Sequence, residues 1–478
     1  MSARKVAAIK LSAPETKAAR GSRVTGDAKV PGALAMRIIP RNRSIELLLL
    51  AFAIGLNAFE LAQIQLSAIA ILRNDFWLYW LPPAIFALGL HVLMRLKASE
   101  ADPLILPIAV VLNGLGLAEI YRLDLAEAAV DGTQFFAVKQ VIWTCVAMAA
   151  AAGVIYGIKS HLFLRRYVYI SMVIGLALLL LPALPVIGQT INGARLWINI
   201  GGLTFQPGEL AKIALTIFFA GYLVTKQDSL SVVGRKVFGI KLPRARELGP
   251  ILLVWAASLG VLVLERDLGT SLLYFGVFLV MIYLATGRPF FVVIGLGLFV
   301  TGALVASRLM TYVNSRIDGW LNPFDDAHYN ADGGSYQLVQ GIWGMAHGGL
   351  LGTGLGGGTP QIVPLAESDF IIASLGEEIG LIGIFGVLVL YLLLVSRGIR
   401  IGFNHDDDFS KLLAAGLSFV IALQTFIVIG GVTRVVPLTG LTTPLMAAGG
   451  SSLLANWIII AILLRISDSV RGQAQVSN

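Results

Sequence analysis

Apolar stretches long enough to cross a bilayer recur along the whole chain and alternate with short polar segments. A membrane-spanning helix needs about 20 consecutive, mostly apolar residues, and twelve stretches come close to this length. They lie near residues 45–68, 77–95, 103–121, 138–158, 167–186, 206–225, 248–264, 268–286, 289–306, 369–396, 411–431 and 446–464. The pattern predicts an all-α polytopic membrane protein with about 12 transmembrane helices.

The composition agrees with a membrane protein and argues against several other classes. Of the 478 residues, 56% are hydrophobic and only 13% are charged, whereas soluble domains carry about 25% charged residues. The single cysteine, Cys145, lies inside an apolar stretch, and the five histidines show no metal-ligand spacing. We therefore expect neither a disulfide nor a zinc site. The sequence contains no Walker-type phosphate loop, which argues against an ATP-driven pump.

The distribution of basic residues predicts which side of the membrane each segment faces. If the N-terminus is cytoplasmic, 27 of the 36 Lys and Arg residues fall in cytoplasmic segments, as the positive-inside rule requires. We therefore expect both termini in the cytoplasm and the long loop at 307–368 outside. Residues 1–43 carry ten Lys and Arg against two acids, which predicts a disordered tail that faces anionic lipid and not nucleic acid. Residues 469–478 are expected to form a cytoplasmic C-terminal tail.

Four polar segments that contain glycine or proline fall on or beside the predicted outer side. They are residues 192–212, 265–271, 307–368 and 430–444. Their basic residues include Arg195, Lys212, Arg316 and Arg434. Irregular backbone at membrane depth is tolerated only where it is buried in protein or lines a watery cavity. We therefore predict that the four segments share one outward-facing cavity with a cationic lining.

Acidic residues in two places add candidate chemistry to this cavity. Asp325 and Asp326 follow Pro323, and we expect them in a turn with no helix after it. An acid of this kind could accept a proton from an attacking hydroxyl. Glu209 and Lys212 are spaced i, i+3, so they share a helix face and can pair. This pair is either functional or a structural ion pair, and the sequence does not choose between the two.

Two further features lie after the long loop begins. Glu377 and Glu378 fall about 13 Å into a helix that starts near residue 369. We expect Glu378 to belong to a polar network between helices, and we leave the role of Glu377 open. The glycine-rich residues 348–360 either cradle phosphates through backbone N–H groups or act as a flexible hinge.

Five segments in order resemble motifs of the SEDS family, which comprises the RodA, FtsW and SpoVE proteins. They read NGARLWINIGGLTFQPGELAKI, DLGTSLLYFGVFLVMIYLATGR, YQLVQGIWGMAHGGLLGTGLG, DFIIASLGEEIGLIG and PLTGLTTPLMAAGGSSLLANW. The resemblance implies a glycosyltransferase core at residues 103–468, preceded by two additional helices within 44–102. Those helices and the segment NGLGLAEIYRLD are most similar to actinobacterial RodA.

The resemblance also implies an activity. Members of the family polymerise lipid II, as both donor and acceptor, into β-1,4 glycan strands and release undecaprenyl pyrophosphate. The reaction inverts the anomeric configuration, because an α-linked donor becomes a β-linked product. The implied setting is the bacterial plasma membrane and its lipids, the implied role is cell elongation and shape, and the implied partner is a class B penicillin-binding protein, a transpeptidase. The resemblance leaves room for a divalent cation such as Mg²⁺ or Mn²⁺ but assigns no metal ligand.

Residue by residue, the family pattern L-D-P-x-x-D-P places the catalytic aspartate at Asp326. The pattern is irregular here, because Ala327 replaces the last proline and the spacer to Tyr336 is longer, so Asp325 and Asp332 stay open as alternatives. Substrate-binding roles are implied for Arg195, Glu209, Lys212, Asp267 and Arg434, and a role for Glu377 is left open. Arg195 and Lys212 would hold the donor pyrophosphate, with Glu209 orienting Lys212.

Three other functions stay open from the sequence. An FtsW-type division polymerase would carry out the same reaction at another place in the cell. A lipid II flippase would use the same substrate without needing a base in an exposed loop. A scaffold for a cell-wall synthase would need neither the base nor the substrate site.

Overall fold

The computed structural model describes most of the chain after the N-terminal region. The described residues are 41–128, 136–184, 187–191, 193–200, 203–231, 236–237, 240–241, 256, 260, 267–331 and 334–476. The predicted tail at 1–43 lies almost entirely outside this set, and so does most of the predicted helix at 248–264.

Within the described part of the chain, eleven helical segments are long and apolar enough to span a membrane. They are α1 (Arg41–Ile69), α2 (Phe76–Lys97), α3 (Ile105–Ala128), α4 (Phe136–Gly157), the run of η1 (His161–Tyr167), α5 (Val168–Leu180) and η2 (Leu181–Ala183), α6 (Gly208–Ser231), α8 (Leu268–Thr286), α9 (Pro289–Leu309), α13 (Ile371–Phe403), α14 (Asp408–Val432) and α15 (Gly450–Val476). Each coincides with a predicted span. The prediction of an all-α polytopic membrane protein is confirmed.

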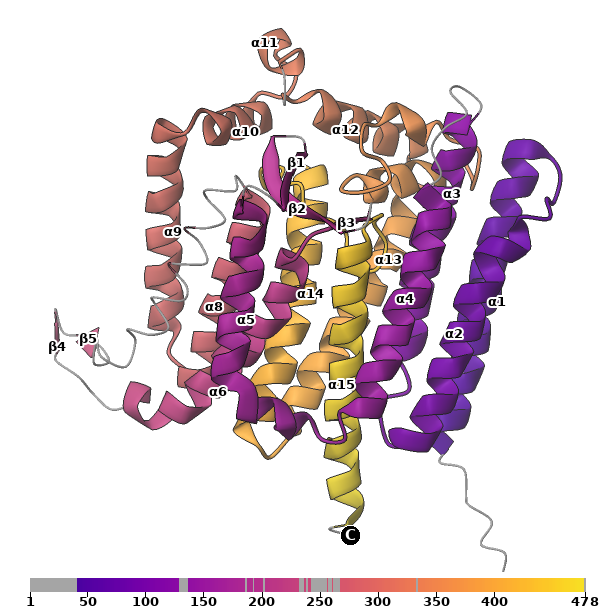
Figure 1. The fold of residues 1–478 in the computed structure, drawn as a ribbon. Helices are drawn as coiled ribbons and strands as arrows, with labels where there is room; N and C mark the ends of the chain where they lie inside the picture. The colour runs from indigo at the N-terminus through magenta and orange to yellow at the C-terminus, as the bar shows by residue number, and fades with distance from the viewer. Residues whose placement is uncertain are drawn as a thin grey trace, which may run out of the picture. The chain divides into compact units, whose positions relative to one another are not determined.

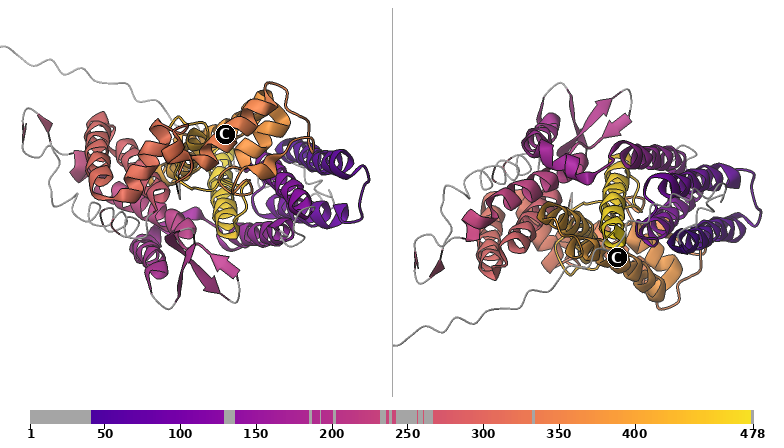
Figure 2. Two further views of the ribbon diagram at one scale, coloured as in Figure 1. Left: turned by 90° about the horizontal axis from the view of Figure 1, so that it is seen from above. Right: turned by 90° about the horizontal axis from the view of Figure 1, so that it is seen from below.

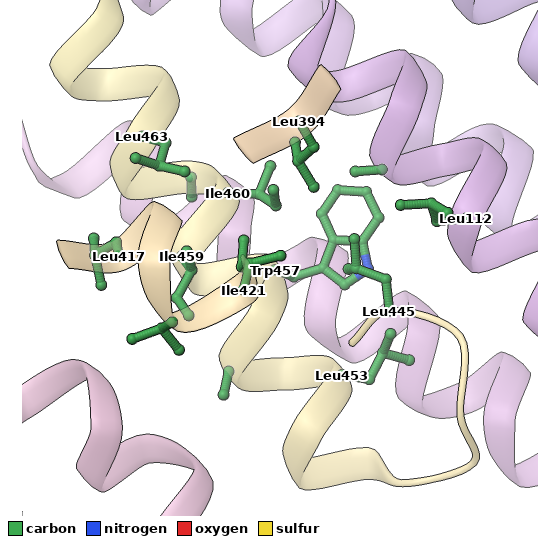
Figure 3. Close-up of a cluster of buried hydrophobic side chains, with 14 of the residues drawn as sticks. Leu112, Leu394, Leu417, Ile421, Leu445, Leu453, Trp457, Ile459, Ile460 and Leu463 are labelled. Carbon is green, nitrogen blue, oxygen red and sulfur yellow. The ribbon is translucent and has the colours of Figure 1, made fainter. Parts of the chain in front are cut away.

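These helices form a bundle in which neighbours in space are often distant in sequence. Helix α15 packs against α4, and α13 packs against α14 and α3 (Figures 1 and 2). Figure 3 shows the fully buried Trp457 of α15 among Leu112 of α3, Leu394 of α13 and Leu445. Lipid tails are as apolar as these side chains, so close van der Waals packing and interhelical hydrogen bonds hold such a core together. Trp457 Nε1 accordingly donates to Asn113 Oδ1 at 3.4 Å.

The two N-terminal helices contact the rest of the bundle through α3 and α4. At one end of the pair, Arg43 bonds to Glu46 and to the carbonyl of Ala101, and His91 Nδ1 lies 2.6 Å from Glu46. These polar groups are buried, so each needs the partner that the others provide. The contact between His91 and Glu46 joins α2 to α1, and the bond from Arg43 to Ala101 joins α1 to the segment before α3.

The structure also contains strands that the apolar pattern does not predict. Strands β1 (Gly188–Ile191), β2 (Ala194–Ile200) and β3 (Leu203–Phe205) form an antiparallel sheet, with Gly188 opposite Ile198 and Ile198 opposite Phe205. A second pair, β4 (Lys236–Val237) and β5 (Ile240–Lys241), lies between α6 and α8 in sequence. The first sheet occupies the polar segment for which we predicted irregular backbone at the cavity.

The long loop after α9 is largely helical. It contains α10 (Thr311–Leu321), α11 (Asp326–Tyr329), α12 (Tyr336–Gly348) and η3 (Pro360–Ile362), and α10 and α12 run across the end of the bundle where the three-stranded sheet also lies (Figure 1). The expectation that no helix follows the aspartate pair is wrong. Asp325 is the N-cap of α11, and its side chain accepts a hydrogen bond from the Ala327 N–H, a role for which aspartate is well suited.

Helix α13 is interrupted at Gly380, where φ is +68°. The glycine-rich chain after α12 fills the break: the N–H groups of Thr353 and Gly354 donate to the carbonyls of Glu377 and Glu378 at 3.0 and 2.9 Å. A Cβ at Gly352 would lie 2.1 Å from the Glu378 carbonyl oxygen, so only glycine fits there. The amides of Thr353 and Gly354 are therefore paired with α13 and are not available to cradle a phosphate, and these bonds anchor the segment so that it is not a free hinge.

Candidate functional site

A cavity of about 600 Å³ opens among the elements at this end of the bundle. All four polar segments contribute to its lining. Segment 192–212 contributes Trp197 and Glu209, segment 265–271 contributes Asp267, segment 307–368 contributes Arg316, and segment 430–444 contributes residues 438–442. The shared cavity predicted from the sequence is thus present. Residues 448–452, at the start of α15, form a further part of the lining that the sequence analysis did not include.

Helix termini shape the electrostatic character of the cavity. Helices α6, α8 and α15 each begin at its wall, where Glu209, Asp267 and Ser451 line it. The N-terminus of a helix carries a partial positive charge and unpaired N–H groups, which favour bound anions. The acidic side chains of Glu209 and Asp267 occupy this favourable field.

The predicted pair of Glu209 and Lys212 is present and buried. Lys212 Nζ lies 2.5 Å from Glu209 Oε2 and 2.9 Å from Gln424 Oε1, and the two charged side chains are 3% and 6% exposed. Gln424 in turn donates to the carbonyl of Thr442 in the cavity wall. Glu209 lines the cavity and Lys212 does not, so the lysine acts on the cavity through the glutamate and the glutamine.

Among the residues that the structure describes, Arg316 is the one basic residue that lines the cavity. Its Nη1 donates to the carbonyl of Leu438 at 2.9 Å, and its charge acts on Asp267 and Asp369 in the same lining. Burial raises the pKa of both carboxyl groups, and the Arg316 charge opposes that shift in each. Asp267 also accepts from the Thr270 N–H at 2.8 Å as the N-cap of α8.

The other basic residues predicted for the site lie elsewhere. Arg195 on β2 donates to the carbonyl of Leu184 at 3.0 Å and does not line the cavity. Arg434 donates to the carbonyls of Trp320 and Leu321, both at 2.8 Å, and so holds the end of α10. The expectation of a cationic lining is therefore wrong for the described residues, because only one of the four basic residues faces the cavity and three acids accompany it.

Asp326 is the first residue of α11, which projects beyond α10 and α12 in Figure 1. Its side chain and that of Asp325 are exposed, and neither lines the cavity. The chain on both sides of α11 does line it, at Trp320 and at Gly334. The structure thus places Asp326 on a short excursion that leaves the cavity rim and returns to it. Asp332 lies outside the described residues.

The two adjacent glutamates belong to a buried polar network at some remove from this lining. Glu378 is fully buried, accepts from Arg122 Nε at 3.0 Å and accepts from the Gly356 N–H at 2.8 Å. Glu377 accepts from the Thr359 N–H at 3.0 Å and lies 2.9 Å from His347 Nδ1. The network predicted for Glu378 is confirmed, and Glu377 has the same kind of role, since both side chains hold the glycine-rich segment in place.

Sequence reasoning did not assign a role to several residues that line the cavity. Asp369 is the first residue of the predicted span at 369–396, and Trp197, Ser451 and Ser452 lie in family motifs without an obvious chemical signal. Arg316 falls on the predicted outer side of the membrane, and this is the signal that the sequence offers for this residue.

The acidic side chains of the cavity do not form a metal-binding cluster. Among the residues that the structure describes, no group of three His, Cys, Asp or Glu side chains is arranged to hold a metal ion. Glu209, Asp267 and Asp369 share the cavity but do not form such a group.

The fold and the cavity define a multi-pass membrane protein with a polar site where several helices begin. Comparison with known proteins gives the family. The model of the cell cycle protein family FtsW, RodA and SpoVE matches residues 103–472. The chain belongs to this family, known as SEDS.

Individual relatives place the chain within the family. It is 46% identical over 435 residues to the protein named peptidoglycan glycosyltransferase RodA of Mycobacterium bovis, covering 91% of this chain and 92% of that protein. It is 32% identical over 380 residues to stage V sporulation protein E of Bacillus subtilis, covering 78% and 99%. The higher identity to mycobacterial RodA agrees with the resemblance to actinobacterial RodA.

Solved structures share the fold. One of them describes the structural coordination of polymerization and crosslinking by a peptidoglycan synthase complex. A chain of that structure matches with a TM-score of 0.58 at 25% identity, and the match covers 74% of this chain and 96% of that one. The rod shape determining protein RodA of Thermus thermophilus matches with a TM-score of 0.51 at 23% identity, covering 77% and 96%. The Thermus match supports the arrangement of helices alone.

Proposed function

We propose that this protein is a peptidoglycan glycosyltransferase that polymerises lipid II into β-1,4 glycan strands and releases undecaprenyl pyrophosphate. The observation that carries the proposal is the cavity, where Arg316 and the N-termini of three helices face one another. The guanidinium and the helix N-termini are the groups of this lining that can bind a pyrophosphate next to the membrane, although Glu209, Asp267 and Asp369 stand in the same lining. The relatives named peptidoglycan glycosyltransferase RodA support the same activity.

In the proposed reaction, the donor pyrophosphate binds in the cavity against Arg316. A guanidinium can hold two phosphate oxygens at once, and in doing so it would exchange its interactions with Asp267 and Asp369 for stronger ones. The buried Lys212 adds positive charge behind Glu209. As the bond between the donor sugar and its pyrophosphate breaks, these groups stabilise the negative charge that grows on the leaving group.

Asp326 acts as the general base in this proposal. Its carboxylate accepts the proton of the acceptor sugar 4-hydroxyl, and the hydroxyl oxygen attacks the anomeric carbon of the donor. The bond from that carbon to the pyrophosphate oxygen breaks, and its electron pair leaves with undecaprenyl pyrophosphate. Attack from the opposite face inverts the configuration from α to β. The acceptor would bind at the rim between Trp320 and Gly334, from which the segment that carries Asp326 extends.

The remaining predicted residues take supporting roles in the proposal. Arg434 positions the loop, because it is bonded to the end of α10 just before Asp326 in sequence. Arg195 stabilises the sheet that forms one wall of the cavity. Asp325 caps α11 and so sets the direction of the helix on which Asp326 stands.

For the cellular setting, we propose that both termini are cytoplasmic and that the 307–368 loop faces outward. The charge distribution of the sequence supports this orientation. A role in elongation and shape is supported by the greater identity to RodA than to the sporulation protein. A class B penicillin-binding protein is the proposed partner, in line with the synthase complex that shares the fold.

The test is an assay of purified protein with labelled lipid II. Polymer that is absent from the Asp326→Asn variant supports the proposal. Transfer of lipid II between leaflets without polymer would identify a flippase, and neither activity would identify a scaffold. Either of the last two results overturns the proposed function.

A further inference from the structure

The outer face of α12 carries aromatic side chains that the fold does not need. Tyr336, Gln340 and Trp343 recur at the spacing of one helix face. The buried Leu338 and Gly341 lie on the opposite side of α12, and the buried Val339 lies at the edge of this face. Tyr336 is 42% exposed and Trp343 is 51% exposed, so these rings point away from the bundle.

A third ring joins them from the helix that carries the proposed base. Tyr329 of α11 contacts Tyr336 edge-on, with ring centroids 5.2 Å apart, and lies 6.4 Å from the Trp343 ring. Gln340 Nε2 donates to the Tyr329 hydroxyl at 3.1 Å. We call Tyr329, Tyr336, Gln340 and Trp343 the aromatic platform. Because Tyr329 stands one turn after Asp326 on the same short helix, the platform begins beside the proposed base.

The charge of the surroundings limits what this platform can bind. Residues 317–396, which include the whole platform, contain no Lys or Arg. Arg434 lines a pocket beside Ile342 and Ala346 of α12, but its guanidinium already donates to the carbonyls of Trp320 and Leu321. The stretch that carries the platform therefore offers no Lys or Arg side chain to a phosphate or another anion. Exposed rings with an amide among them suit a neutral ligand that has both an apolar face and polar edges. A pyranose ring of an N-acetylhexosamine is such a ligand, because its C–H face can lie on an aromatic ring while its hydroxyl and acetamido groups bond to amides and hydroxyls.

We propose that the aromatic platform binds the glycan strand, a linear chain of neutral β-1,4-linked N-acetylhexosamines, next to Asp326. This proposal rests on the proposed function, since it names a binding site for that reaction. The platform holds the sugars that adjoin the reacting end and keeps the strand attached between additions. Removing a ring should therefore shorten the polymer more than it slows the formation of each bond.

The binding test does not depend on turnover. The full chain with Asp326→Asn is placed in lipid nanodiscs and titrated with a short fluorescent oligomer of β-1,4-linked N-acetylglucosamine. Trp343→Ala should weaken binding about tenfold, the effect of losing one well-placed ring contact, and Trp343→Phe should restore most of it. The control is Trp77→Ala, which removes a Trp of similar exposure, 55%, from α2.

A second measurement uses the active chain and lipid II. Trp343→Ala and Tyr329→Ala should give shorter glycan strands than the wild type, whereas Trp77→Ala should give strands of wild-type length. Unchanged oligomer binding in Trp343→Ala overturns the proposal. If the same variant also captures less of the transpeptidase, the platform is a contact for that protein and not for sugars. If the wild type makes no polymer, the proposed function fails, while the oligomer titration still decides whether the platform binds sugars.

Discussion

Replacing Glu209 with glutamine should destabilise the protein, because Lys212 would keep its charge without a counter-charge. Lys212 Nζ lies 2.5 Å from Glu209 Oε2, and both side chains are almost fully buried. Two unit charges at this distance attract by about 7 kcal/mol at an effective dielectric constant of about 20. The substitution removes this attraction but keeps an amide oxygen near the lysine.

The net cost is smaller than the direct attraction. Lys212 keeps its bond to Gln424 at 2.9 Å, and the new amide can still accept a hydrogen bond. Removing one partner of a buried ion pair costs about 3–5 kcal/mol in measured cases, and we expect Glu209→Gln to fall in the lower part of that range. Replacing both residues, as Glu209→Gln with Lys212→Met, should recover most of the loss, because no buried charge remains.

The assay is thermal unfolding of the purified protein in detergent, together with the rate of lipid II polymerisation per folded molecule. The single variants Glu209→Gln and Lys212→Met should each unfold at a lower temperature than the wild type. The double variant should unfold at a temperature close to that of the wild type. Turnover should stay low in every variant without Glu209, because this side chain lines the cavity. Single variants as stable as the wild type would refute the reasoning about buried charge, and normal turnover per folded molecule would make the pair purely structural.

The remaining predictions concern the base, the α8 cap and the orientation. Asp326→Asn should lower the rate of polymerisation by about 10²–10⁴-fold with lipid II binding retained, while Asp325→Asn should keep substantial activity; the reverse result would move the base by one residue. Asp267→Ala should lose about 1 kcal/mol of stability with the cap, whereas Asp267→Asn keeps the acceptor. Burial raises the pKa of Asp267, so the contribution of this side chain to the free energy of unfolding is greatest below about pH 4 and falls as the pH rises. Unfolding measured as a function of pH should show a smaller decline in Asp267→Asn than in the wild type. In a cysteine-free chain, a cysteine at the exposed Leu351 should react with an impermeant maleimide in intact cells, and one at the exposed Asn404 only after permeabilisation.

The membrane spans could be predicted because their signal is local. A run of apolar residues is sufficient to place a helix, and the described helices coincide with the predicted ones. The break in α13 could not be predicted in the same way. The apolar run continues through Gly380, and the helix is interrupted there because the chain around Gly352 is inserted between its turns. That contact joins segments whose packing no local pattern describes.

The candidate site could be predicted only in part, because its segments have a local signal and the directions of its side chains do not. The sequence identified the segments that meet at the cavity, because charge bias and polar composition mark the outer ends of the spans. It could not identify which side chains face inward. Arg195 and Arg316 are equally basic, yet the strand that carries Arg195 directs it to the carbonyl of Leu184, while α10 places Arg316 in the lining. This choice depends on how a sheet and a helix are set on the bundle.

The position of the proposed base follows from contacts at both ends of its excursion. Arg434 bonds to the carbonyls of Trp320 and Leu321 before α11. After α11, Ser335 joins the two ends of the excursion. Its hydroxyl donates to the Pro323 carbonyl at 2.6 Å, and its N–H donates to the His328 carbonyl at 3.0 Å. Residues 324–327 between these contacts are exposed, so the anchors at both ends and not a packed core determine where a carboxylate on α11 can reach. In the proposed mechanism, a base held in this way can meet an acceptor at the rim, while the donor pyrophosphate binds in the cavity that Arg316 lines.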